Sequence, residues 1–148
     1  MKRVVVAQLN EGYQRDGYRN PGMVHGASTL LGRIRRYAEV HRFESVMLHA
    51  VGMETVNLCF YLLGGLSGVR PLCIHPESQL TEIVLLMEEA LSSEKPYYLN
   101  VYISPREHVP TLLGAFVPGA AFEDEGWAPC GLLCRHEDGK NAFYPGMR

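Results

Sequence analysis

The order of elements in this chain is decided by residues 20–76, which read NPGMVHGASTLLGRIRRYAEVHRFESVMLHAVGMETVNLCFYLLGGLSGVRPLCIHP. The Pro21-Gly22 pair is a turn signal, and apolar residues then recur at helical spacing. The apolar face of this first helix consists of Ala27, Leu30, Leu31, Ile34 and Ala38. A short apolar strand is predicted over residues 45–51, a second helix over 54–63, and a further strand over 69–75.

The flanking segments continue this alternation of strands and helices. Residues 4–9 are apolar and β-branched, so they predict a buried first strand. Apolar residues at helical spacing predict a third helix over residues 80–91. The β-branched and aromatic run over residues 97–104 predicts a fourth strand. The predicted order is therefore βαβαβαβ.

Two short segments near the C-terminus, residues 132–136 and 141–144, flank a Glu-Asp-Gly-Lys turn and predict a β-hairpin. We therefore predict an α/β fold, namely a two-layer sandwich with a small sheet and a C-terminal β-hairpin extension. The chain is expected to form a single domain over residues 1–148. Within it, residues 1–107 form the α/β core, and residues 108–148 form the loop and hairpin extension.

The composition excludes several classes of protein. The chain has 148 residues, of which 47% are hydrophobic and 20% charged, as is typical of a soluble globular domain. Its formal net charge of -2 lacks the basic excess of proteins that neutralise many phosphates at once, so any nucleic-acid contact must be local. No apolar run is long enough for a signal peptide or a membrane span. We therefore expect a cytoplasmic protein with reduced cysteines and no membrane contact.

The predicted helix over residues 54–63 is apolar on nearly every side. A helix of this kind is normally covered by other elements or by another subunit. We therefore expect a homo-oligomer, a dimer or higher, and we expect the side chain of Phe60 on this helix to be buried.

Arginines and tyrosines in the loop 12–22 and on the first helix form the main candidate binding surface. Guanidinium groups can hold phosphate through two hydrogen bonds, and aromatic rings can stack on bases. An alternative is that the charges only solvate the outer side of the helix. A third interpretation is a small anion, such as a nucleotide, bound by the loop against the start of the helix, where free N–H groups favour an anion. The residues concerned are Tyr13, Arg15, Tyr18, Arg19, Arg33, Arg35 and Arg36.

Four features of residues 20–74 point to one known family. They are Asn20-Pro21-Gly22 before the first helix, the strand 45–51 ending at Gly52, the short helix through Val56, and the strand Leu72-Cys73-Ile74. On these features the segment resembles the core of the Alba superfamily, which includes the stage V sporulation protein S family. The resemblance implies a dimer whose loop after strand one and turn after strand two face nucleic acid. Carried over by position, the residues implied are Arg19, Asn20, Gly52 and Met53.

Cysteines and histidines offer a second candidate site. A metal is geometrically allowed at the set Cys130, Cys134 and His136, because residues 134 and 136 of a strand share a face. The spacing matches no known zinc motif, and core packing with buried thiols is the preferred interpretation.

No pattern in the sequence identifies a catalytic residue. His49 lies within a predicted strand and is expected to be a hydrogen-bonded core histidine. An acid/base set could be assembled from Asp16, Glu54, His75 and His108, but no spacing joins its members. No nucleophile motif, phosphate loop or dinucleotide fingerprint occurs, so we expect no cofactor.

Three hypotheses follow. The leading one is a non-catalytic, oligomeric protein that contacts nucleic acid or oligonucleotide through the loop 12–22 and the first helix. The second is a protein that binds or sequesters a small anionic ligand, such as a nucleotide signal. The third is an enzyme that acts on a phosphate-containing substrate with histidine catalysis, for which His49 and His75 are the residues to test.

Overall fold

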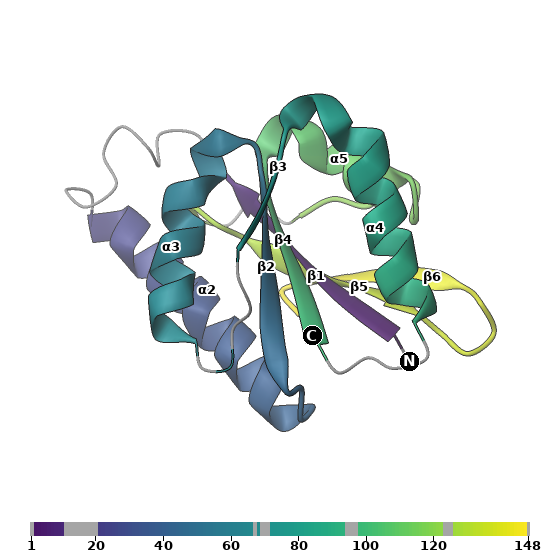
Figure 1. The fold of residues 1–148 in the computed structure, drawn as a ribbon, viewed down its shortest axis with the longest axis horizontal. Helices are drawn as coiled ribbons and strands as arrows, with labels where there is room; N and C mark the ends of the chain where they lie inside the picture. Colours follow the sequence, from purple (N-terminus) through teal and green to yellow (C-terminus); the bar gives the residue numbers. More distant parts are fainter. Residues whose placement is uncertain are drawn as a thin grey trace.

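The structure, a computed structural model, describes residues 2–10, 21–66, 68, 72–93, 98–122 and 126–147. Figure 1 shows a twisted sheet with helices on both of its sides. The main elements, in chain order, are β1 (Lys2–Leu9), α2 (Pro21–Val40), β2 (Ser45–Val51), α3 (Val56–Gly65), β3 (Cys73–His75), α4 (Leu80–Ser92), β4 (Tyr98–Pro105), α5 (Val109–Gly114), β5 (Cys130–Arg135) and β6 (Asn141–Pro145).

The six strands form one sheet in the order β3-β2-β4-β1-β5-β6. Strands β3, β2, β4 and β1 are parallel, with Val5 of β1 opposite Val101 of β4. Strand β5 runs antiparallel to β1, and β6 closes the C-terminal hairpin against β5. The α/β class, the βαβαβαβ order and the terminal hairpin are therefore confirmed.

The core is formed on both faces of the sheet. Residues Val4 to Ala7 of β1 are all 0% exposed, because alternate side chains enter opposite layers. Val5 and Ala7 contact the layer that contains helices α2 and α3. Val4 and Val6 contact the layer that contains α4 and α5. Parallel strands covered on both faces are expected to be continuously apolar, as β1 is.

Helix α5 was not predicted. The segment around it is rich in Pro and Gly and therefore resembles a loop. Pro110, however, lies in the first turn of the helix, where a backbone N–H would make no hydrogen bond within the helix, so proline is tolerated there. Val109, Leu112 and Leu113 are buried in the α4 layer. Packing onto the sheet therefore stabilises a helix of only six residues.

The expectation that Phe60 is buried is wrong, since its side chain is 58% exposed. Helix α3 contacts the sheet through Val56, Leu58, Cys59 and Leu62, which are its buried residues. Helix α3 is therefore not covered on every side within this chain, although its sequence is apolar on nearly every side. The homo-oligomer stays a prediction. No helix among the described residues is long and apolar enough to cross a membrane.

Histidine 49 belongs to a polar network on the α4 side of the sheet. Its Nδ1 lies 2.9 Å from Nε2 of His75, and its Nε2 lies 2.9 Å from Oδ1 of Asn100. The ring of Tyr102 stacks on His49 with centroids 4.1 Å apart. Burial lowers the pKa of His49 to about 4, so the ring is neutral at pH 7. The expected core histidine is therefore observed, and both of its nitrogens are engaged.

We predict that Leu62→Ala lowers the free energy of unfolding by about 2–5 kcal/mol, because it removes a fully buried side chain from the sheet layer. Phe60→Ala, on the same helix, should cost roughly 1 kcal/mol or less in the isolated chain, because Phe60 is exposed. Urea denaturation of both variants would measure the difference. An equal loss of unfolding free energy in the two variants would contradict the orientation of α3.

We also predict that His49 makes stability fall in acid. Between pH 6.5 and about 4 the unfolded chain binds a proton at His49 that the native chain does not, so the free energy of unfolding decreases as the pH falls through this window. The loss from this residue should reach about 2–3 kcal/mol at the acidic end. Denaturant unfolding of wild type and His49→Gln at several pH values would measure it. An identical pH dependence in the variant would exclude His49 as the cause.

Candidate functional site

The carboxyl ends of the four parallel strands lie at one edge of the sheet, which is where open α/β sheets generally bind ligands. At the end of β1, backbone hydrogen bonds tie the chain to the segment that precedes β5. The N–H of Gln8 donates to the carbonyl of Pro129 at 2.8 Å, and the N–H of Asn10 donates to the carbonyl of Trp127 at 2.9 Å. The side-chain amide of Asn10 donates to the carbonyl of Gly126 at 2.6 Å. Residues 126–129 are thereby held beside the end of β1.

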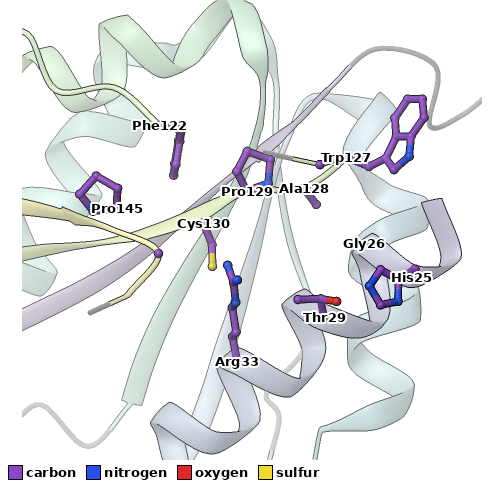
Figure 2. A pocket seen from close by; sticks show the side chains of 12 residues that line it. His25, Gly26, Thr29, Arg33, Phe122, Trp127, Ala128, Pro129, Cys130 and Pro145 are labelled. Atoms are coloured by element: carbon purple, nitrogen blue, oxygen red, sulfur yellow. The ribbon is translucent and has the colours of Figure 1, made fainter. Parts of the chain in front are cut away.

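Helix α2 comes close to this segment at Gly26. A Cβ added at Gly26 would lie 3.2 Å from the Cβ of Trp127, a tighter contact than most side chains accept. The absence of a side chain at this position therefore lets the helix lie against the tryptophan segment. The approach creates a pocket of about 210 Å³ between α2, residues 126–130 and the end of β6 (Figure 2).

One line of polar residues on α2 borders this pocket: His25, Thr29 and Arg33. They are four residues apart along the chain, and residues at this spacing lie above one another on a helix. Figure 2 shows Arg33 extending from the helix toward the sulfur of Cys130. Phe122, Trp127 and Pro145 are among the apolar residues of the lining.

Arg33 provides the positive charge of the pocket. Among the described residues, no carboxylate lies within ion-pair distance of its guanidinium, whereas the side chain of Arg135 is paired with Glu88 at 2.6 Å. A guanidinium with no carboxylate partner in the described part of the chain can hold two oxygens of a phosphate or carboxylate. The pocket can therefore bind a small anionic group.

The thiol of Cys130 borders the same pocket and hydrogen-bonds with Arg33. Burial raises the pKa of Cys130 above its ordinary value, and the guanidinium only partly opposes this effect. The sulfur is therefore a neutral thiol at pH 7. Because the thiolate is the nucleophilic form, Cys130 is not an activated nucleophile in this structure.

A second group of side chains lies farther along the same edge. A one-turn 3₁₀ helix follows each of three neighbouring strands: η2 (Met53–Thr55) after β2, η3 (Glu77–Gln79) after β3, and η4 (Arg106–His108) after β4. Burial, followed by the Glu77 and Glu107 carboxylates, raises the pKa of Glu54. We call Glu54, Glu77, Glu107 and His108 the carboxyl-edge cluster.

The residues predicted from the sequence lie in several places. Arg33 borders the pocket, and Arg36 is exposed on α2 outside the lining. Gly52 and Met53 follow β2 beside the carboxyl-edge cluster. The loop candidates Tyr13, Arg15, Tyr18, Arg19 and Asn20 lie outside the described residues.

The three suggested metal ligands do not form a joint site. Cys130 borders the pocket, Cys134 is buried, and Nε2 of His136 lies 3.1 Å from the hydroxyl of Tyr144. Within the described part of the chain, the group of three whose donor atoms come within 4.8 Å of one another is instead Glu77, Glu107 and His108.

Sequence reasoning missed His25, Thr29 and Trp127. The spacing His25-x3-Thr29-x3-Arg33 was visible as a polar line on a predicted helix. The position of Trp127 opposite that line depends on the hydrogen bonds to the end of β1. No local sequence pattern predicts these hydrogen bonds.

Comparison with known proteins supports the fold but no family membership. No family model matches the sequence, and no curated protein matches it. Among solved structures, the chain is similar to a phosphoglycerate mutase from Plasmodium falciparum, with a TM-score of 0.62 and 7% sequence identity. The match covers 97% of this chain and 89% of the mutase chain. At this identity the likeness concerns the fold alone.

This finding overturns the Alba resemblance and the nucleic-acid-binding protein that it implied. The matched fold extends over 97% of the chain, whereas the features of the Alba core lie within residues 20–74 and recur in many α/β proteins. The structure also directs Arg33 into a small pocket, while Arg36 stays outside it. The two arginines therefore do not act together as one open basic surface.

Proposed function

We propose that this protein is an enzyme that acts on a small phosphate-containing substrate with histidine acid-base chemistry. The observation that carries the proposal is the single line of His25, Thr29 and Arg33, which opens into one pocket beside the carboxyl end of β1. The similarity of the fold to a phosphoglycerate mutase supports the same class of substrate.

Arg33 and Thr29 are the proposed phosphate ligands. The guanidinium would hold two phosphoryl oxygens, and the Thr29 hydroxyl would donate a hydrogen bond to another oxygen of the same group. Residues four apart on a helix have Cβ atoms about 5–6 Å apart, so both side chains can reach one phosphate group. The volume of about 210 Å³ favours a small ester over a polymer.

His25 is the proposed proton donor and acceptor. In hydrolysis, water forms a new bond to phosphorus while the ester P–O bond breaks. The protonated imidazole gives its proton to the departing alcohol oxygen, and the proton lost by the attacking water restores the imidazole. An imidazole suits both steps because it can gain and lose a proton near neutral pH.

Other candidates in the chain fit this role less well. His49 is 5% exposed, and both of its ring nitrogens are engaged by His75 and Asn100. His25 is exposed and borders the cavity, so a substrate can reach it. The reactive histidine proposed here therefore differs from the His49 and His75 pair suggested by the sequence.

We predict that purified protein releases phosphate from a panel of small monoesters that includes p-nitrophenyl phosphate and phosphoglycerate. Arg33→Ala should lower kcat/KM by about 100-fold or more, because a charged donor to the phosphoryl oxygens is lost. His25→Asn should lower kcat by about 100- to 10,000-fold. Steady-state phosphate release would measure both effects.

Arg36→Ala is the matched control, since Arg36 lies on the same helix but outside the pocket. Its turnover should equal that of wild type, and circular dichroism should show all three variants folded. Equal loss in Arg33→Ala and Arg36→Ala would reject the pocket as the site. Absence of turnover of every ester by folded wild type would reject the proposed function.

A further inference from the structure

The carboxyl-edge cluster collects donors from three strand ends. Strands β3, β2 and β4 are neighbours in the sheet, and the 3₁₀ turn after each of them contributes an acidic residue from its first turn. These residues are Glu54 after β2, Glu77 after β3 and Glu107 after β4. His108 follows Glu107 and adds an imidazole nitrogen. The donor atoms of Glu77, Glu107 and His108 come within 4.8 Å of one another, at the edge of the sheet where open α/β folds bind their ligands.

The donor atoms lie close enough together to share one metal ion. Nε2 of His108 lies 2.9 Å from Oε2 of Glu77 and 3.6 Å from Oε1 of Glu107. Zinc binds nitrogen and oxygen ligands at about 2.1 Å in a tetrahedral arrangement, so two of its ligands lie about 3.4 Å apart. The observed separations bracket this value. All three donor atoms lie within 4.8 Å of one another, and a bound ion would replace the hydrogen bond between His108 and Glu77.

Gly52 leaves room for the side chain of Glu77. Gly52 has a φ of 79°, and a Cβ built on it would lie 2.7 Å from Cγ and 2.9 Å from Cδ of Glu77. The carboxylate side chain thus occupies the space that any other residue at position 52 would fill. The N–H of Gly52 donates to the carbonyl of His75 at 2.8 Å, which fixes the turn to β3. The positive φ favours glycine at position 52, and the absence of a side chain there leaves room for the Glu77 carboxylate.

We propose that Glu77, Glu107 and His108 bind a first-row divalent metal ion of the Zn²⁺ type. A nitrogen ligand with two carboxylates suits Zn²⁺ better than Mg²⁺ or Ca²⁺, which prefer oxygen alone. His108 is 20% exposed, whereas Glu77 and Glu107 are 41% and 68% exposed. The site is therefore anchored by the imidazole and open to solvent on its carboxylate side. Three protein ligands leave a position for water or substrate, as in catalytic rather than structural zinc sites.

This proposal goes beyond the proposed function and does not require it. The pocket on α2 lies at the end of β1 and uses Arg33, whereas the metal ligands follow β3 and β4. Metal binding can be measured without any turnover. Zinc binding without ester hydrolysis would support the metal site and reject the proposed function. Ester hydrolysis without zinc binding would support the proposed function and reject the metal site.

The test is isothermal titration calorimetry of ZnCl₂ into full-length protein that has been dialysed against EDTA. Wild type should bind one Zn²⁺ per chain at the cluster. His108→Ala should weaken binding by about 100-fold or more, because loss even of a residue that only supports a ligand can cost 10- to 100-fold. Glu107→Gln is the second variant, since this residue is 68% exposed and its replacement should leave folding intact.

His136→Ala and Glu137→Gln are matched controls, because they change the same residue types elsewhere in the chain and should bind as wild type does. The visible spectrum of the Co²⁺-substituted protein should lack thiolate charge-transfer bands. Such bands, or weakened binding in His136→Ala, would assign the metal to the cysteines instead. Zinc affinity that is unchanged in both His108→Ala and Glu107→Gln, or no binding by wild type, would overturn the proposal.

Discussion

The pairing of β1 with strands on both of its sides is the constraint on which the rest of this structure depends. Parallel pairing with β4 connects β1 to the β3-β2 half of the sheet, and antiparallel pairing with β5 connects it to the hairpin. Its side chains enter both helical layers, so neither layer is complete without it. The same parallel register brings the carboxyl ends of four strands to one edge, and both proposed sites occupy that edge.

Local patterns were sufficient where apolar residues form a continuous β-branched run or recur at helical spacing. The β-branched run of β1 and the helical spacing in α2 and α4 predicted those elements close to their observed ranges. Helix α5 could not be predicted in the same way, because its stability comes from burial of Leu112 and Leu113 against residues distant in sequence. The exposure of Phe60 has a similar origin, since only the position of the sheet decides which side of an apolar helix faces inward.

In the candidate sites, too, single residues could be named from local sequence, but their neighbours in space could not. The sequence named Arg33 as a candidate phosphate ligand, since an arginine on the outer side of a helix is a local feature, and this role stays a prediction. Its neighbours Trp127 and Cys130 come from the other end of the chain and reach it through hydrogen bonds with β1. Glu54 and His108 were also considered together, but no spacing linked them. The strand order β3-β2-β4 is what unites them, and that order is a long-range property.

The two sites place opposite charge at one edge of the sheet. The pocket presents Arg33, whereas the carboxyl-edge cluster presents three carboxylates and one histidine. Because Coulomb interactions extend about 8–10 Å at physiological salt, an empty cluster repels any phosphate that comes within this range. A divalent cation bound at Glu77, Glu107 and His108 would remove most of that repulsion and attract the anion instead. If both proposals hold, an empty cluster would favour anions at the Arg33 pocket, and a bound metal would extend phosphate binding toward the cluster.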